Sequence, residues 1–264
     1  MSIASPATHP VLIAGTWREA NAESTFQATD PNRNEKLDAA FPVSSWKDCD
    51  EALDAAVEAA TELRKLGPAK IADFMEAYAD KIDAAKDQLV ETAFAETGLA
   101  RSPRLADVEL PRTSNQLRAA AKACRTGNWA MPTIDTQTGI RSCLGPLGPV
   151  CVFGPNNFPF AFGSVSGGDF AAAIAAGNPV IGKANSSHPD TTRLFAELAL
   201  EALTETGLPT ATVQLIYRTS HADGEKLVSD PRVGATGYTG SRGAGLTLKA
   251  AADKAGKPIY LELS

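Results

Sequence analysis

From residue 149 to residue 264, short apolar runs alternate with longer amphipathic segments, and no other feature of this sequence restricts its fold so strongly. The apolar runs lie at 150–153, 179–183, 213–217, 233–238 and 259–262. The segments between them carry apolar residues three or four positions apart, and two of them end at Gly177 and Gly207, a pattern typical of helices. Short apolar strands joined by helices predict an α/β fold, in which a Rossmann-like parallel sheet is covered by helices on both faces.

The residues before this alternation predict a mainly helical segment. Residues 1–10 are expected to form a loose tail, and residues 11–17 and 25–29 to form short strands around polar turns. Apolar residues at helical spacing then predict four helices, from about Ser45 to Gly67, around Ile71–Ile82, from about Asp87 to Gly98, and from Ser102 to Arg125 with a break at Pro111.

Residues 132–147 differ from both of these parts. They alternate around the turn Gln137-Thr138-Gly139, which predicts a two-stranded β-arm. We therefore divide the chain into an N-terminal helical part at 1–131, the arm at 132–147 and a sheet-forming part at 148–264.

The composition is that of an ordinary globular protein, with 44% hydrophobic residues, 21% charged residues and a net charge of −6. Because there is no surplus of positive charge to neutralise phosphates, we expect no nucleic-acid partner. No apolar run is long enough to cross a membrane, and the N-terminal segment lacks the features of a secretory signal. The cysteines and histidines show no metal-ligand spacing. These features favour a cytoplasmic protein that binds a small molecule and no metal.

Polar and glycine-rich segments follow four of the five predicted strands. They are Phe153-Gly-Pro-Asn-Asn-Phe-Pro159, Lys183-Ala-Asn-Ser186, Tyr238-Thr-Gly-Ser-Arg-Gly-Ala-Gly245 and Leu261-Glu-Leu263. Ligands of parallel sheets bind beyond the carboxyl ends of the strands, which makes these segments the candidate site. Each segment alone has a plain structural explanation: a turn for the asparagines, a solvated strand end for the lysine, and tight helix packing for the glycines. The G-x-G-x-x-G fingerprint of dinucleotide-binding folds is missing.

Taken together, the order and spacing of the four segments resemble the aldehyde dehydrogenase superfamily. That family has Asn-Phe-Pro after the first strand, a lysine after the second, a Thr-Gly-Ser turn after the fourth and a glutamate after the fifth. The resemblance covers nearly the whole chain, including Ala14-Gly-Thr-Trp17 and Asp30-Pro-Asn32.

Within the superfamily, the chain is similar to the branch of α-ketoglutaric semialdehyde (2,5-dioxopentanoate) dehydrogenases and an NADP-linked fatty aldehyde dehydrogenase. The similarity is carried by Val152–Phe162, Gly167–Gly177 and Lys183–Pro189. The sequence departs from that branch at Pro155-Asn156, where smaller residues are usual, and by an extra residue near Gly163. It also ends at Ser264, directly after Glu262-Leu263.

The resemblance implies a reaction and two catalytic residues. The family oxidises an aldehyde to a carboxylic acid through a cysteine thioester, with transfer of a hydride to NAD(P). Asn157 matches the amide that stabilises the oxyanion, and Glu262 matches the carboxylate that activates water. The alternatives are a turn cap for Asn157 and an ordinary strand-end carboxylate for Glu262.

The resemblance places the nucleophilic cysteine beyond Ser264, so that the catalytic-cysteine domain is expected to be absent. None of Cys49, Cys124, Cys143 and Cys151 matches it. We therefore expect the chain to be inactive alone.

The resemblance also implies the cofactor-binding residues. Lys183 is expected to hold the adenosine ribose or its phosphate, and the Gly240-Ser241 turn with Gly245 to place helix N–H groups near the pyrophosphate. Phe153, Gly154 and Pro155 are expected to line the path to the nicotinamide. Asn156, Ala244 and Leu263 complete the expected set.

Ser186 favours NADP over NAD. NAD-preferring members of the family commonly have a glutamate at this position, three residues after the lysine, where a carboxylate would repel a 2′-phosphate. Serine removes that charge, and Lys183 attracts the phosphate. Arg218, after the third strand, is a further candidate for this contact. NAD remains the alternative.

Two other functional classes predict different sequence features. A truncated, non-catalytic module that binds a dinucleotide or a partner subunit would also carry these segments. An ordinary Rossmann reductase would carry a Tyr-x-x-x-Lys pair and a glycine fingerprint, and the sequence has neither. We favour part of an aldehyde-oxidising enzyme whose full-length form is a homo-oligomer with a small aldehyde as substrate.

Overall fold

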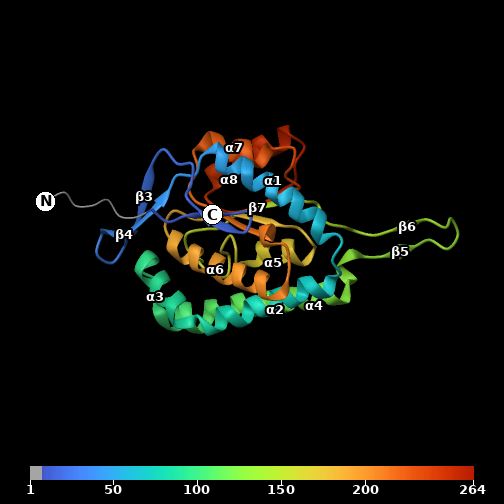
Figure 1. Cartoon of the computed structure of the whole chain (residues 1–264), viewed down its shortest axis with the longest axis horizontal. Coiled ribbons are helices and arrows are strands. Elements are labelled where there is room, and N and C mark those ends of the chain that lie inside the picture. The colour runs from blue at the N-terminus through green and yellow to red at the C-terminus, as the bar shows by residue number, and fades with distance from the viewer. Residues whose placement is uncertain (1–7) are drawn as a thin grey trace.

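The computed structural model describes residues 8–264, and its centre is a seven-stranded sheet (Figure 1). The strand order is β11-β10-β7-β8-β9-β1-β2. Five of these strands are parallel to one another: β7 (Val150–Phe153), β8 (Val180–Lys183), β9 (Val213–Ile216), β10 (Ala235–Gly240) and β11 (Ile259–Leu263). All residues of β7 and β9 are buried, because helices cover both faces of the sheet.

The helices form two layers, which confirms the predicted fold class. One layer contains α1 (Trp46–Leu63), α7 (His221–Ser229) and α8 (Arg242–Lys254), which lie above the sheet in Figure 1. The other contains α2 (Pro68–Ala84), α3 (Lys86–Thr97), α4 (Leu110–Thr126), α5 (Gly168–Ala175) and α6 (Pro189–Thr206). Buried residues of both layers and of the sheet belong to one continuous core, with Leu53, Tyr78 and Phe195 among its fully buried side chains.

The N-terminal strands are more extensive than the sequence predicts. The strands β1 (Val11–Ile13) and β2 (Thr16–Arg18) extend the main sheet, with β1 antiparallel to β9 through the pair Leu12 and Leu215. A separate hairpin joins β3 (Thr25–Asp30) to β4 (Glu35–Pro42), and β4 was not predicted.

The expected loose tail falls partly outside the described residues, at 1–7. For residues 8–10, which the structure describes, the expectation of a loose tail was wrong. Thr8 forms a bridge with Ala40, and the His9 ring stacks on Phe41 with 4.9 Å between the ring centroids. The apolar end of β4 therefore holds this segment against the core.

The segment before α4 is irregular. Residues Arg101–Glu109 form a π-helical element, η1, in which Ser102 has an extended backbone. The regular helix α4 starts at Leu110 with Pro111 in its first turn, so the predicted break at Pro111 is a helix start. Two 3-10 turns complete the elements, η2 (Asn128–Ala130) and η3 (Thr210–Thr212).

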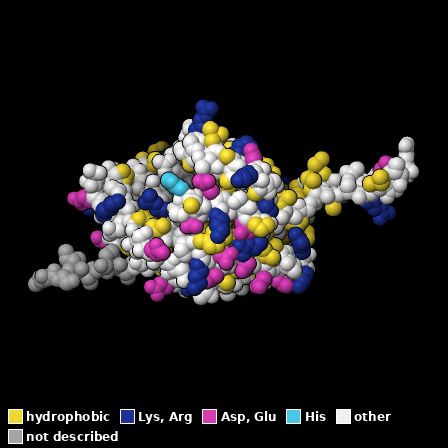
Figure 2. All heavy atoms as spheres, turned by 90° about the horizontal axis from the view of Figure 1, so that it is seen from above, with side chains coloured by type: hydrophobic (Ala, Val, Ile, Leu, Met, Phe, Trp, Pro, Cys, Tyr) yellow, Lys and Arg dark blue, Asp and Glu magenta, His cyan; other side chains and the backbone are white. Residues whose placement is uncertain are grey.

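The arm leaves the body of the molecule as a narrow hairpin of β5 (Thr133–Ile134) and β6 (Arg141–Ser142). Asp135 closes its turn by accepting hydrogen bonds from the backbone N–H groups of Gln137 and Thr138. Its apolar side chains are exposed to solvent: Ile134 by 63% and Ile140 by 64% (Figure 2). Among the helices of residues 8–264, none is both long and apolar enough to cross a bilayer.

Candidate functional site

The order of the parallel strands creates a crevice at their carboxyl ends. The chain passes from β7 to β8 and β9 on one side, then crosses to β10 and β11 on the other side of β7. The strand order therefore reverses between β7 and β10, and such a reversal opens a crevice beyond the strand ends. The loops after both strands, which carry Asn157 and Ser241, border this point.

A cleft of about 820 Å³ occupies this position. Ten of the predicted cofactor-binding residues line it, namely Phe153, Gly154, Pro155, Asn156, Lys183, Ser186, Arg218, Gly240, Ser241 and Ala244. Residues from the loops that follow four parallel strands, β7, β8, β9 and β10, thus come together, as expected for one ligand site.

Several lining residues are not among the predicted cofactor-binding residues, although Asn185, Tyr238 and Thr239 belong to the predicted segments. These lining residues are Asn185, Ser187, Thr219, Ser220, His221, Gly224, Glu225, Tyr238, Thr239, Thr247 and Leu248. The Thr219–His221 segment had a usable signal, since it is a polar run between the third strand and the next helix. Thr247 and Leu248 had no such sequence signal, because their position in the lining depends on which face of α8 packs toward the cleft.

The loop after β7 is fixed by contacts from the loop after β8. The Asn185 side chain donates a hydrogen bond to the Gly154 carbonyl at 3.1 Å. Nε2 of buried His188 lies 2.8 Å from the Pro155 carbonyl, and it must be the protonated nitrogen because a carbonyl only accepts. Burial lowers the pKa of His188, so its imidazole is neutral at physiological pH.

The same loop is held from the other side by η1. The Arg104 guanidinium donates to the Asn157 carbonyl at 2.8 Å, and its Cζ lies 3.9 Å from the Phe158 ring centroid. Oε1 of buried Glu109 accepts the N–H groups of Phe160 and Ala161 at 2.8 and 3.1 Å. The backbone that carries Asn157 is therefore anchored at both its ends.

Asn157 itself lies beside the main cleft and lines a second one of about 490 Å³. The second cleft shares Asn156, Ser186, Ser187 and Arg218 with the main cleft, and the β3–β4 hairpin forms its far wall. The Asn157 residue is exposed, which leaves its side-chain amide accessible to a ligand.

Glu262 projects toward the α5 side of the sheet. In the strand register Gly237 pairs with Tyr260 and Thr239 pairs with Glu262, so these side chains share one face. A Cβ on Gly237 would lie 2.7 Å from an Asp169 carboxylate oxygen at the start of α5, which identifies that face. Burial and the charge of Glu262 raise the pKa of Asp169, so the two carboxylates interact.

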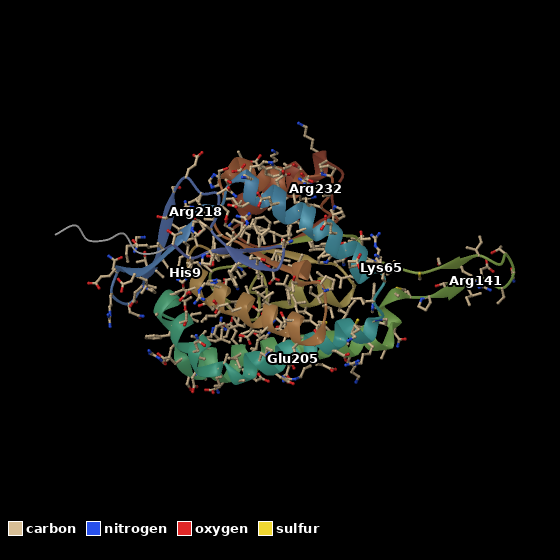
Figure 3. All side chains as sticks on the ribbon, in the orientation of Figure 1. His9, Lys65, Arg141, Glu205, Arg218 and Arg232 are labelled. Atoms are coloured by element: carbon tan, nitrogen blue, oxygen red, sulfur yellow. The ribbon has the colours of Figure 1, made fainter. Side chains whose placement is uncertain are left out.

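Two cationic side chains, Lys183 and Arg218, line the main cleft. The loop after β8 contributes Ser186 to the lining and no carboxylate. Burial and the nearby charge of Arg218 lower the pKa of Lys183 to about 8. The ammonium group lies 5.6 Å from the Phe153 ring centroid. Arg218 is exposed, and Figure 3 places it at the end of the molecule near the β3–β4 hairpin, opposite Arg141 of the arm.

The fourth loop leads into the N-terminus of α8. Ser241 is the N-cap and makes no side-chain capping bond, and the Arg242 N–H donates to the Ser264 carbonyl at 3.3 Å. The N–H groups of Gly243 and Ala244 are thus the first-turn donors left for a ligand, and Ala244 lines the cleft. Gly245 and Leu263 do not line the cleft. A Cβ on Gly245 would overlap the Leu263 side chain, so this glycine allows α8 to pack closely on β11.

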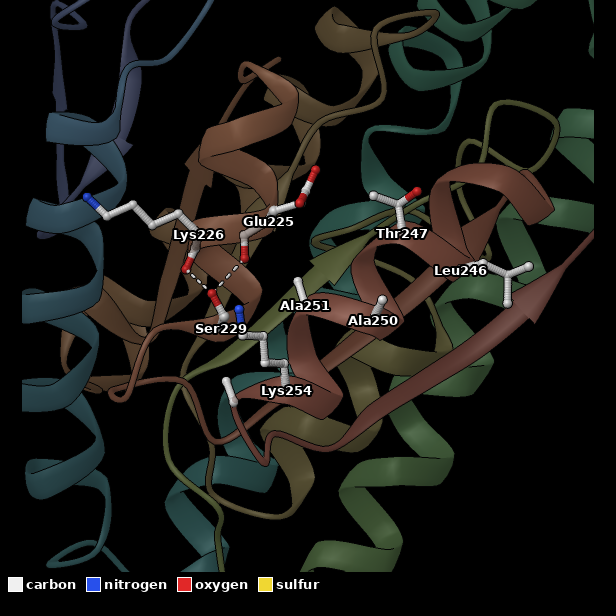
Figure 4. A pocket seen from close by; sticks show the side chains of 9 residues that line it. Glu225, Lys226, Ser229, Leu246, Thr247, Ala250, Ala251 and Lys254 are labelled. Atoms are coloured by element: carbon white, nitrogen blue, oxygen red, sulfur yellow. Dashed lines mark hydrogen bonds between the residues drawn. The ribbon is translucent and has the colours of Figure 1, made fainter.

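A groove of about 970 Å³ between α7 and α8 continues from the cleft, with which it shares Glu225 and Thr247 (Figure 4). Leu246, Ala250 and Ala251 give it apolar walls. Lys226 points away from the groove toward α1, where its ammonium group lies 3.6 Å from the Trp46 ring centroid.

Three of the four cysteines are buried, and Cys143 is exposed on the arm. Burial raises the pKa of Cys49 to about 12 and raises the pKa of Cys151 further. Within residues 8–264 no group of three or more histidine, cysteine and acidic residues is arranged to hold a metal ion.

The family model for the aldehyde dehydrogenase family matches residues 17–264. Alpha-ketoglutaric semialdehyde dehydrogenase 2 of Azospirillum brasilense is 39% identical over 96% of the chain and 50% of its own length. Alpha-ketoglutaric semialdehyde dehydrogenase of Acinetobacter baylyi is 35% identical over 96% of the chain and 49% of its own length. Among solved structures, PnpE of Pseudomonas sp. WBC-3 superposes with a TM-score of 0.85 at 25% identity, covering 98% of this chain and 51% of that protein.

The chain thus spans about half the length of the curated relatives that it matches. The matched region contains all four strand-end segments of the predicted site. Fold, strand-end segments and family model agree, and the chain belongs to the aldehyde dehydrogenase family.

Proposed function

We propose that this chain is the cofactor-binding part of an enzyme that uses NADP to oxidise a semialdehyde, such as 2,5-dioxopentanoate, to the carboxylic acid. In this proposal residues 1–131 and 148–264 together form the cofactor domain. Residues 132–147 form an oligomerisation arm, and the nucleophilic cysteine comes from residues outside this chain. The names of the relatives from Azospirillum and Acinetobacter support the substrate class.

The single observation that carries the proposal is the convergence of ten predicted residues on one cleft at the strand reversal. NADP held there would supply the acceptor for the hydride. The open N–H groups at the start of α8 suit the pyrophosphate, and the loop from Phe153 to Asn156 leads from the cleft toward Asn157.

The two catalytic roles follow from the chemistry of the side chains. Attack of a thiolate on the aldehyde places negative charge on the carbonyl oxygen, and the accessible Asn157 amide donates a hydrogen bond to it. Glu262 is an exposed carboxylate at the end of β11 and removes a proton from the water that hydrolyses the thioester. The anchored Asn157 loop keeps the donor in place during both steps.

The preference for NADP rests on charge. Lys183 and Arg218 both face the cleft, and Ser186 supplies no carboxylate to repel a 2′-phosphate. Calorimetric titration of the chain with NADP and with NAD tests this part of the proposal, and NADP is expected to bind more tightly. Tighter binding of NAD would contradict the cofactor assignment, and no binding of either would contradict the site.

Catalysis is tested on the whole protein by aldehyde-dependent reduction of NADP, followed at 340 nm. Reduction with semialdehydes is expected. A whole protein that binds NADP but reduces none with any aldehyde would favour the non-catalytic dinucleotide-binding module.

A further inference from the structure

Arg112 stands in the first turn of α4 beside the loop that carries Asn157. Its guanidinium Cζ lies 4.9 Å from the Phe162 ring centroid. The rings of Phe162 and Phe158 pack edge to face with 5.2 Å between centroids, and Phe158 directly follows Asn157. Arg112 and Asn157 are therefore connected by one short aromatic surface.

The charges around this aromatic pair are unequal. Arg104, which covers the Phe158 ring, lies 3.4 Å from Oε2 of the fully buried Glu109. Burial raises the pKa of Glu109, while its hydrogen bonds to the loop and the two arginines act in the opposite direction. In the part of the chain that the structure describes, Arg112 has no carboxylate within 4.0 Å. Glu109 is thus paired with Arg104 alone, and the exposed Arg112 carries the surplus positive charge.

An arginine whose guanidinium lies over an aromatic ring is suited to bind a carboxylate. The ring holds the guanidinium plane, while its N–H edge stays free for two parallel hydrogen bonds. A guanidinium and a carboxylate in this arrangement form one of the stronger hydrogen-bonded pairs in proteins. The rings of Phe158 and Phe162 offer an apolar surface for a short carbon chain between the two polar ends.

We propose that Arg112 binds a carboxylate at the far end of the substrate, so that the enzyme selects short aldehydes with a carboxylate over uncharged aldehydes of the same length. This inference rests on the proposed function, in which Asn157 binds the oxygen at the aldehyde end. Arg104 is a positioning residue, because its own contacts are made to the Asn157 carbonyl and to Glu109.

The test compares 5-oxopentanoate with pentanal, which have the same number of carbons and differ in the carboxylate. The whole enzyme and its Arg112→Met and Arg112→Lys variants are assayed with both, and the ratio of the two kcat/KM values is the readout. We expect the wild type to favour 5-oxopentanoate and Arg112→Met to lower the ratio about tenfold or more. Arg112→Lys keeps the positive charge but cannot form a bidentate pair with a carboxylate. Its ratio of kcat/KM values should therefore fall between those of the wild type and Arg112→Met.

Lys122→Met is the matched control, because Lys122 is an exposed cation farther along α4. It removes the same charge from the same helix, and its ratio is expected to equal that of the wild type. NADP titration of every variant shows that the fold is intact, and Arg112→Lys keeps the test valid if Arg112→Met does not fold.

Different experimental results would overturn the role of Arg112 and the proposed function. An unchanged ratio in the Arg112 variants, or a wild type that oxidises pentanal as well as 5-oxopentanoate, overturns the role of Arg112 while aldehyde oxidation stands. A wild type that oxidises neither aldehyde with NADP or NAD overturns the proposed function and this inference with it.

Discussion

At the scale of single residues, Lys183 gives the cleft a dependence on pH. Its pKa is lowered to about 8 by burial and Arg218, so in the free chain it loses its proton as the pH rises through 8. A bound 2′-phosphate favours the charged ammonium, and binding above pH 8 must therefore include uptake of a proton. We expect the affinity for NADP to fall about tenfold between pH 7 and pH 9. Calorimetry in buffers of different ionisation enthalpy measures the proton uptake, and Lys183→Met should bind NADP weakly and show no such pH dependence.

Ser186 offers the sharpest test of cofactor choice. A glutamate at this position would place a carboxylate in the cleft that Lys183 and Arg218 share. Ser186→Glu is expected to weaken NADP binding about tenfold or more while NAD binding is kept, because the carboxylate repels the phosphate. Ser186→Ala, which stays neutral, serves as the control in fluorescence titrations. If Ser186→Glu and the wild type bound NADP with equal affinity, the charge at position 186 would not determine the preference for NADP.

Asn157 should affect the reaction and not cofactor binding. In the whole enzyme, Asn157→Ala is expected to lower turnover about 100- to 1000-fold, since one oxyanion donor is lost. Titration of the variant with NADP should give the wild-type affinity. A turnover within the error of the wild type would exclude the oxyanion role.

The positions of these residues could be predicted because the parallel topology dictates them. Because Phe153, Lys183 and Gly240 are the last residues of parallel strands, they must lie at one edge of the sheet. Arg104 and Glu109 could not be predicted, because their partners Asn157 and Phe160 lie about fifty residues away along the chain. No local pattern in η1 indicates that it packs on that loop.

At the scale of elements, the buried Glu96 of α3 is hydrogen-bonded to the start of α6. Its carboxylate accepts hydrogen bonds from the N–H groups of Asp190 and Thr191, each at 2.8 Å, at the start of α6. Glu96→Met would leave both of these N–H groups without an acceptor, and we expect it to lower the free energy of unfolding by about 1–3 kcal/mol. Glu201→Met on the exposed face of α6 is the control, since surface ion pairs contribute about 0–1 kcal/mol.

The effect of Glu96 should depend on pH. Burial raises its pKa to about 8 in the folded chain, so the folded state binds an extra proton between the pKa of the unfolded chain and pH 8. Wild-type stability relative to Glu96→Met is therefore highest near pH 5 and decreases as the pH rises toward 8. Urea unfolding of both proteins at pH 5, 6.5 and 8 measures the difference, and a constant difference would contradict it.

The helices and parallel strands were predictable because their apolar periodicity is regular, whereas β4 and η1 lacked such a signal. Residues Glu35, Lys36 and Asp38 of β4 are charged and exposed, and only Phe41 and its neighbours Ala40 and Pro42 are buried. Their strand structure depends on pairing with β3. The segment of η1 departs from helical geometry at Ser102, which a helical spacing of apolar residues does not reveal.

At the scale of the whole molecule, the arm is the feature that best fits contact between copies of the chain. Ile134, Ile140 and Leu144 are each more than half exposed, and exposed apolar side chains of this kind mark interaction surfaces. We expect the chain to self-associate in analytical ultracentrifugation. Replacing residues 133–143 by a short glycine-serine turn should reduce the association and leave NADP binding intact. Ile134→Lys with Ile140→Lys should act in the same way, and a chain that is monomeric with its arm intact would contradict the assignment.

The pairing of β1 with β9 has a consequence for synthesis. Leu12 leaves the ribosome about two hundred residues before Leu215, the strand partner that it needs. At the usual rate of about 5–20 residues per second, this apolar N-terminal strand waits on the order of ten seconds or more without its neighbour. The nascent chain must keep Val11–Ile13 from aggregating during that time, so translation speed and chaperone access influence the yield of folded protein.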